Sequence, residues 1–282
     1  MKFSKIKSYA KINLSLNILE KKNSKFHKIE SLISFIDLHD LIYLRKIKSK
    51  SHKIYFNGKF KKGINKNNTV SHLIKILDGK KILQDQKFEI KIIKNIPHES
   101  GMGGGSMNAS SIINYFIQKK IIRLKKKEII EIANIIGSDV ILGFKKKNTI
   151  LLGNGNLKTF LKKINYYLLI AKPNFGCSTK LIYSKVKNFS KSQYKKPNLS
   201  FLNKDHILKS KNELEKIAFN LYPILKKMKI YLSKMPNVIF SRMSGSGSSI
   251  VAYFDSKKAA SIAARTFRGK FKGYWCIVSK TI

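Results

Sequence analysis

The chain has 282 residues, of which 43% are hydrophobic, so it can form one large or two ordinary globular domains and is not disordered in composition. The absence of CxxC and HExxH motifs excludes a disulfide framework and the common zinc sites. No stretch reaches the ~18 apolar residues that cross a bilayer, and no signal peptide of usual length is present. We therefore expect a cytoplasmic protein with no membrane partner.

The net charge of +43 has two interpretations. Strongly basic proteins often bind nucleic acid through their charge. Only five of the 58 cationic residues are arginines, however, and the lysines are scattered along the whole chain. Proteins that bind nucleic acid usually retain arginine for bidentate contacts with bases and phosphates, whereas compositional drift toward A/T-rich codons favours lysine. We expect no specific nucleic-acid partner, and the sequence leaves the oligomeric state unknown.

The first half of the chain mixes strands and helices. Residues 9–18 alternate between apolar and polar side chains and predict a half-buried strand whose polar face carries Lys11 and Asn13. The further elements expected before the middle of the chain are an apolar segment at 30–44, strands at 53–60 and 88–93, and helices at 69–77, after 106 and at 126–136.

The second half continues the mixture. The expected elements are strands at 166–172, 238–240, 250–254 and 275–279, helices at 212–232 and 256–267, and a lysine-rich surface loop at 188–198. Helices and antiparallel strands in two blocks indicate an α+β protein with two domains. We predict an N-terminal domain at 1–160 and a C-terminal domain at 161–282.

A glycine-rich loop joins a predicted strand to a predicted amphipathic helix at residues 97–107, PHESGMGGGSM. Glycines let main-chain N–H groups converge on an anion, and the following helix adds the positive end of its dipole. The loop is neither a Walker A motif, which needs Gly-Lys-Ser/Thr, nor a dinucleotide fingerprint, which needs a third glycine. The pattern predicts a phosphate-binding loop, with a tight helix entry as the alternative.

A second cluster, RMSGSGSSIVAYF at 242–254, lies between two apolar segments. Alone it is typical of a hairpin loop. Together with the first loop, it is a candidate to close over the same phosphates.

Asp139 lies in an otherwise apolar run, IANIIGSDVILGF. A buried carboxylate is costly unless it is paired, so the residue is either a helix cap or a functional base. Lys11 is the candidate partner, and a solvated strand face is its alternative. In the functional interpretation Asp139 accepts a proton from a substrate hydroxyl, and Lys11 keeps it ionised and stabilises the transferring phosphoryl group.

These pieces together resemble the GHMP kinase superfamily over nearly the whole chain. The segments that carry the resemblance are AKINLSLNIL, FHKIESLISFIDLHD, IPHESGMGGGSMNAS, IGSDV, PNFGCSTKLIYSKV and MSGSGSSIVAYF. The resemblance implies a two-domain fold with the active site in a cleft between the domains. AKINL and FHKIESL resemble the members that use ATP to phosphorylate the 2-hydroxyl of 4-diphosphocytidyl-2-C-methyl-D-erythritol in non-mevalonate isoprenoid synthesis.

The resemblance also implies roles for individual residues. Lys11 and Asp139 take catalytic positions. The ATP-binding residues expected are Asn68, Pro97, His98, Glu99, Ser100, Gly101, Met102, Gly103, Gly104, Gly105, Ser106, Met107 and Gly245. The residues expected to bind the second substrate are Asn13, Phe26, His27, Thr179 and Tyr183. ATP is the expected co-substrate, with Mg²⁺ held by Ser106 or by the substrate phosphates and no dedicated metal ligands.

The sequence departs from the superfamily pattern in several places. Glu99 and Ser100 stand where glycines are expected, Ile141 where proline is usual, and Phe26 where tyrosine is usual. Three other hypotheses stay open at this point. They are a different kinase of the superfamily, a relative that binds nucleotide without turnover, and a basic nucleic-acid-binding protein.

Overall fold

A computed structural model describes residues 2–21 and 27–282. The chain forms two compact units, each assembled from three separate segments. Unit one contains Met1–Ala10, Leu38–His98 and Gly103–Lys146, and unit two contains Lys11–Asp37, Glu99–Met102 and Lys147–Ile282. The division into sequence domains at residue 160 stays a prediction.

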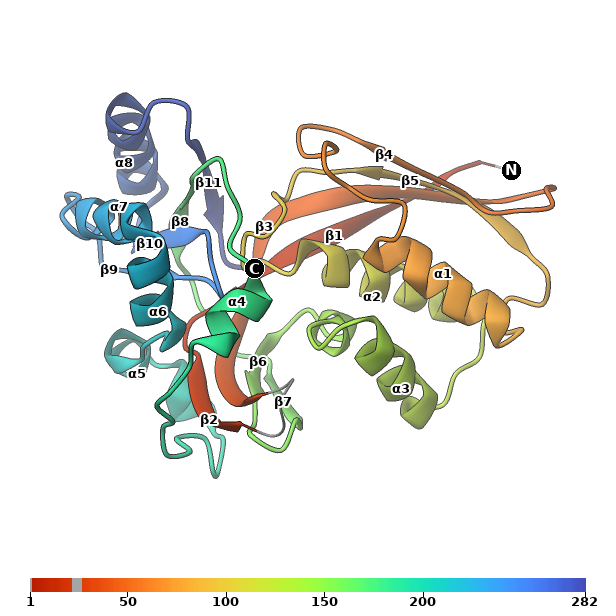
Figure 1. The fold of residues 1–282 in the computed structure, drawn as a ribbon, viewed down its shortest axis with the longest axis horizontal. Helices are drawn as coiled ribbons and strands as arrows, with labels where there is room; N and C mark the ends of the chain where they lie inside the picture. The colour runs from red at the N-terminus through yellow and green to blue at the C-terminus, as the bar shows by residue number, and fades with distance from the viewer. Residues whose placement is uncertain (1, 22–26) are drawn as a thin grey trace. The chain divides into compact units, whose positions relative to one another are not determined.

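Unit one is a sheet covered on one face by helices (Figure 1). Strand β3 (His27–Ile47) pairs antiparallel with β5 (Lys87–Ile93), and β4 (Lys53–Asn57) pairs parallel with β5. The helices α1 (Thr69–Gly79), α2 (Gly104–Gln118) and α3 (Lys126–Ile136) bury their apolar faces against β3 and β5. The packing includes Phe88 of β5 against Phe116 of α2, with ring centroids 4.8 Å apart.

Unit two contains the remaining strands. The N-terminal half of β3 pairs with β2 (Asn17–Lys21) and β6 (Asn148–Leu151), and β6 pairs with β7 (Leu157–Phe160). A separate antiparallel sheet has the order β11-β8-β10-β9. Its strands are β8 (Tyr167–Lys172), β9 (Phe240–Met243), β10 (Ile250–Phe254) and β11 (Trp275–Lys280). This sheet packs against α6 (Leu214–Leu221), α7 (Pro223–Ser233) and α8 (Lys257–Lys270).

The first predicted strand begins and ends earlier in the sequence, and is more deeply buried, than expected. Strand β1 (Ser4–Asn13) ends at Asn13, because the N–H groups of Leu14 and Ser15 both donate to the carbonyl of Leu32 and break the ladder. The polar face is not solvated, since Lys11 and Asn13 are each only 4% exposed. The expectation of a half-buried strand was therefore wrong, and the polar side chains face other protein atoms.

Two other expectations need correction. The helix expected at 212–232 is two helices, since Pro223 cannot donate an N–H in a helix interior and instead begins α7. The segment 188–198 is not merely a surface loop, because the Tyr194 side chain is fully buried and bonds to Ser15 at 2.6 Å.

The strand expected at 238–240 begins only at Phe240. Short elements that the sequence did not indicate are β6, β7, α4 (Thr179–Ser184), α5 (Lys204–Lys209) and the 3-10 turns η1 (Val140–Phe144) and η2 (Leu199–Leu202).

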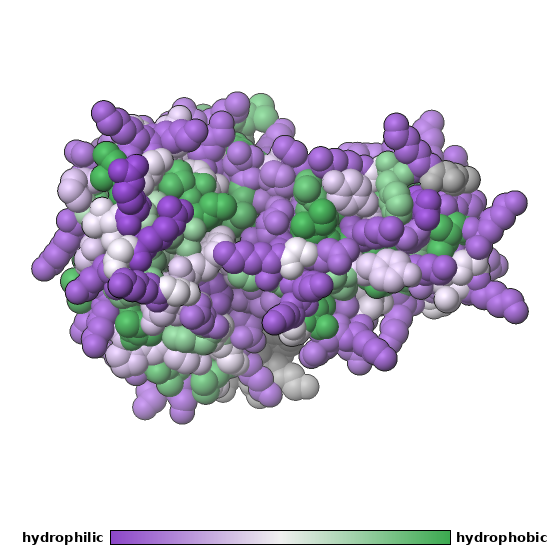
Figure 2. Space-filling view, turned by 90° about the horizontal axis from the view of Figure 1, so that it is seen from above, coloured by the Kyte–Doolittle hydropathy of each residue, from purple (hydrophilic) through white to green (hydrophobic). Residues whose placement is uncertain are grey.

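Within the described part of the chain, no helix is both long and apolar enough to cross a membrane. The face seen in Figure 2 carries hydrophilic side chains over most of its area, with smaller hydrophobic groups between them.

Candidate active site

In unit two, Lys11 and Asn13 are the polar residues at the end of β1. The Lys11 ammonium donates to Asn13 Oδ1 at 2.8 Å, and Asn13 Nδ2 donates to Ser31 Oγ at 2.7 Å. The main-chain N–H of Lys11 donates to the carbonyl of Met102 at 3.1 Å. The predicted catalytic lysine is thus held by its neighbours and fastened to part of the glycine loop.

The two glycine motifs meet in unit two. Ser244 Oγ donates to the carbonyl of Gly101 at 2.9 Å, and the N–H of Asn13 donates to the same hydroxyl at 3.3 Å. A Cβ on Gly245 would lie 3.0 Å from the carbonyl oxygen of Gly101. The second motif is a hairpin loop, since Met243 and Ile250 pair across β9 and β10. Residues 99–102 of the first glycine motif pack against this hairpin loop.

The side chain of Glu99 lies against Gly176, where a Cβ would come 2.2 Å from Glu99 Oε2. Its carbonyl accepts the N–H of Ser248 at 3.1 Å. Burial raises the pKa of the nearby Cys177 thiol to about 12; the charge of Lys172 opposes this rise and the charge of Glu99 adds to it. The carboxylate that replaces a glycine is therefore accommodated beside the segment around Gly176.

In unit one, the other end of the glycine loop forms the start of α2. Gly103 is its N-cap in a left-handed conformation, with φ of +68° and no capping side chain. The first N–H groups of a helix have no intrahelical acceptor and form an anion site. This end of α2 thus presents main-chain donors at Gly104, Gly105 and Ser106.

Asp139 also belongs to unit one and packs near the same helix. It precedes η1, and its side chain makes no capping hydrogen bond. Ser106 Oγ lies 3.7 Å from the position that a Cβ would take on Gly137, two residues before Asp139. A Cβ on Gly143, in η1, would overlap Ser110 of α2 at 2.0 Å. The Gly137–Gly143 stretch that carries Asp139 is therefore seated on α2.

Asn68 and His98, two of the residues predicted to contact ATP, form hydrogen bonds with nearby residues of unit one. Asn68 is the N-cap of α1, and its Oδ1 accepts the N–H groups of Val70 at 3.0 Å and Ser71 at 3.1 Å. The His98 ring bonds to the carbonyl of Phe60. Contacts of either side chain with ATP stay predictions.

An aromatic group in unit two gathers around His27. Its ring centroid lies 5.3 Å from that of Tyr183 and 6.3 Å from that of Phe189, which is stacked at 30°. Thr179 bonds to Ser246 of the second glycine motif at 2.8 Å. Phe26 lies outside the described residues. Phe189 was missed from the sequence because it lies in a lysine-rich segment without periodicity.

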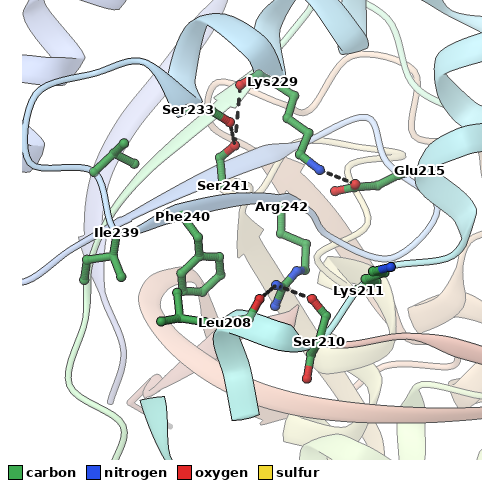
Figure 3. Close-up of a pocket in the computed structure, with 11 residues that line it drawn as sticks. Leu208, Ser210, Lys211, Glu215, Lys229, Ser233, Ile239, Phe240, Ser241 and Arg242 are labelled. Carbon is green, nitrogen blue, oxygen red and sulfur yellow. Dashed lines mark hydrogen bonds and ion pairs between the residues drawn. The ribbon is translucent and has the colours of Figure 1, made fainter. Parts of the chain in front are cut away.

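A cavity of about 370 Å³ in unit two is lined by residues from β9, α6 and α7 (Figure 3). Its most buried charge is Arg242, which donates to the carbonyls of Ile207 at 3.0 Å and Leu208 at 3.4 Å, and also to those of Leu14 and Ser210. Lys229 is paired with Glu215. Because these donors are occupied by protein acceptors, the cavity is not part of the candidate site.

Comparison with known proteins identifies the family. The model described as "GHMP kinases N terminal domain" matches residues 68–146, and "GHMP kinases C terminal" matches residues 199–273. A 4-diphosphocytidyl-2-C-methyl-D-erythritol kinase of Pelagibacter ubique (strain HTCC1062) is 58% identical over 278 residues, which cover 99% of each chain. The chain belongs to the 4-diphosphocytidyl-2-C-methyl-D-erythritol kinase family of GHMP kinases. Another member, from Clostridium perfringens (strain 13 / Type A), is 30% identical over 99% of this chain and 98% of its own.

Solved structures confirm the GHMP kinase fold and the predicted α+β class. A crystal structure of 4-(cytidine 5'-diphospho)-2C-methyl-D-erythritol kinase matches with a TM-score of 0.79 at 22% identity, covering 99% of this chain and 100% of that one. The homoserine kinase from Cytophaga hutchinsonii matches with a TM-score of 0.65 at 18% identity, covering 99% and 94%. The chain is a kinase, for which ATP is the co-substrate.

Proposed function

We propose that this kinase transfers the γ-phosphoryl group of ATP to the 2-hydroxyl of 4-diphosphocytidyl-2-C-methyl-D-erythritol. The family relationship supports the acceptor, because the relative at 58% identity carries that substrate in its name. One observation supports the location of the site. Residues 99–102 of the glycine loop are fastened both to the Ser244–Gly245 turn and to the strand that carries Lys11.

Asp139 acts as the base in this proposal. It accepts the proton of the attacking hydroxyl while the oxygen forms its bond to the γ-phosphorus and the bond to the leaving ADP oxygen breaks. Lys11, held by Asn13, supplies positive charge for the transferring phosphoryl group. The pairing of Lys11 with Asp139 is part of the proposal.

The N–H groups at the start of α2 hold the ATP phosphates, and Gly245 supports the loop from the second motif. The described residues contain no group of three or more His, Cys, Asp and Glu side chains suited to a metal. Mg²⁺ would therefore bind mainly through phosphate oxygens, with the Ser106 hydroxyl as the protein ligand, and would neutralise phosphate charge. Sequence domains at 1–160 and 161–282 complete the proposal.

The cytosine ring of the acceptor is bound by the aromatic group of His27, Tyr183 and Phe189. The ring centroids of Tyr183 and Phe189 lie 5.3 Å and 6.3 Å from that of His27, and aromatic faces stack on a base without needing a specific hydrogen bond. Asn13 and Thr179 are the polar contacts that we assign to the same substrate.

The test is an assay of the purified protein with ATP and a panel of acceptors. We expect turnover with 4-diphosphocytidyl-2-C-methyl-D-erythritol and none with mevalonate or homoserine. Asp139→Asn should lower kcat by about 10²- to 10⁴-fold, which is the usual contribution of a general base, and leave ATP-analogue binding intact. Full turnover of that variant would refute the mechanism. Turnover of mevalonate or homoserine instead would refute the acceptor.

A further inference from the structure

A fully buried carboxylate lies behind the start of the glycine loop in unit one. Asp40 of β3 is 0% exposed in a chain that has only 15 carboxylates. A charge buried to this extent is costly unless it is paired and hydrogen-bonded. The hydrogen bonds and the ion pair of Asp40 therefore show which segments of the chain this residue holds together.

Both oxygens of the Asp40 carboxylate are occupied. Oδ1 accepts the main-chain N–H of Asn95 at 2.8 Å and that of Ile96 at 2.9 Å. Oδ2 accepts from Asn108 Nδ2 at 2.9 Å and pairs with the ammonium of Lys94, which is only 3% exposed. Four donors thus converge on one side chain.

These donors come from the two sides of the glycine loop. Lys94, Asn95 and Ile96 connect the end of β5 to Pro97, whereas Asn108 lies in the first turns of α2. The two sides also touch directly. A Cβ on Gly104 would lie 3.0 Å from Ile96 Cγ2 and 3.3 Å from Lys94 Nζ. Asp40 therefore ties the segment before the loop to the helix after it.

We propose that Asp40 is a positioning residue for ATP. Its carboxylate fixes the segment before Pro97 against α2, so that the N–H groups of Gly104 and Gly105 are already arranged for phosphate when ATP arrives. Lys94 neutralises the carboxylate, so that no net negative charge lies behind the phosphates. The inference rests on the proposed phosphate-binding role of this loop.

Asp40→Asn is the first test. The new amide can still accept the two main-chain N–H groups, but its NH₂ faces the Lys94 ammonium and the Asn108 NH₂. We expect KM for ATP and the dissociation constant of ADP to rise about tenfold or more, with KM for the acceptor unchanged. A purely structural role would lower the melting temperature and leave both KM values of the folded protein unchanged. That second result would overturn the inference.

A double variant keeps the test valid if Asp40→Asn folds poorly. In Asp40→Asn with Lys94→Met, the ammonium is gone and Asn108 can turn its amide. Asn108 Oδ1 has no hydrogen-bond partner among the described residues and is then available to accept from the new NH₂. We expect this variant to fold and to recover ADP affinity to within about threefold of the wild type. The effects of the two substitutions would then be non-additive, as is usual for residues in direct contact. Folding without recovery would contradict the inference.

Two controls separate this inference from the proposed function. Glu89→Gln makes the same change on β5 at a carboxylate paired with Arg45 and Lys91, and should leave both KM values unchanged. Ser106→Glu places a negative charge at the start of α2 and should weaken ADP binding. If it does not, the phosphate site itself is wrong. If Ser106→Glu weakens ADP binding but Asp40→Asn does not, only the role of Asp40 is wrong.

Discussion

Gly101 occupies a position where a side chain has neither the backbone conformation nor the space that it needs. Its φ is +71°, and an added Cβ would lie 1.8 Å from the carbonyl oxygen of Ser244. This glycine is therefore required by the close approach of the two glycine motifs. Ser100 beside it is buried despite replacing a glycine, which shows that the loop tolerates a side chain at one position and excludes it at the next.

Gly101→Ala should lower the free energy of unfolding by about 3 kcal/mol, since strain and overlap combine. Gly155→Ala is the matched control. Gly155 also has a positive φ, of +85°, but nothing lies within 4 Å of its added Cβ, so the loss should be only about 1 kcal/mol. Chemical denaturation of both variants measures the difference. Equal losses would show that the close approach to Ser244 contributes nothing.

His52 gives a pH dependence that can be assigned to one residue. Burial lowers its pKa more than the hydrogen bond to Asp78 raises it. Its Nδ1 accepts the N–H of Phe88 at 3.1 Å, a bond available only to the neutral ring. Because the folded pKa lies below the unfolded value, the unfolded chain takes up the proton first and stability falls as the pH drops below about 6.5.

We expect wild type to lose more unfolding free energy than His52→Gln between about pH 7.5 and about pH 5, since glutamine does not titrate. Denaturation at both pH values makes the comparison. An identical loss in the two proteins would assign the acid sensitivity to other groups.

Among the secondary-structure elements, α1 is capped by Asn68, which is also a predicted contact of the nucleotide. The Asn68 side chain accepts two N–H groups of the first turn, and Ser71 reaches back to the N–H of Asn68 at 2.9 Å. Asn68→Ala should therefore cost about 1 kcal/mol of stability, whereas Asn68→Asp keeps the cap and should cost little. Thermal unfolding tests the cap. KM for ATP of Asn68→Asp tests the adenine contact separately, because aspartate lacks the amide donor.

Elements with strong local signals were predicted well. The helix expected at 126–136 is α3 at the observed bounds, and the amphipathic helix expected after residue 106 is α2. Strands β6 and β7 have only four residues each and no complete alternation, so the sequence did not indicate them. The formation of β6 depends on pairing with β3, which is distant in the sequence, and β7 pairs in turn with β6.

The candidate site combines residues that the sequence indicated with contacts that it did not. Motif resemblance indicated Lys11 and the two glycine loops, and the structure brings Lys11, Gly101 and Ser244 together in unit two. The burial of the polar face of β1 was missed, because alternation cannot distinguish a side covered by water from one covered by Ser31 and Ser244. Asp40 was recognised only as part of a motif. Its four donors converge through folding and leave no local pattern.

At the scale of the whole molecule, the charge of +43 is a cost to stability. Like charges repel in the compact state, and salt screens this repulsion. Raising NaCl from about 20 mM to about 300 mM should increase the melting temperature by several degrees, with most of the gain at the lower concentrations. Calorimetry with sucrose as an uncharged control measures the effect. A melting temperature that falls with salt would mean that the few ion pairs, such as Lys94 with Asp40, outweigh the general repulsion.

The segmented composition of the two units also sets an order of events during synthesis on the ribosome. Unit one draws on nothing beyond residue 146, whereas residues 11–37 of unit two must wait for partners made much later. The N–H of Leu16 donates to the carbonyl of Lys211 at 2.9 Å, and the N–H of Ile282 donates to the carbonyl of Phe35 at 3.1 Å. The strand that carries Lys11 and Asn13 is therefore translated early and completed late. Until those partners are made, the polar groups that the fold later buries on this strand keep their hydrogen bonds to water.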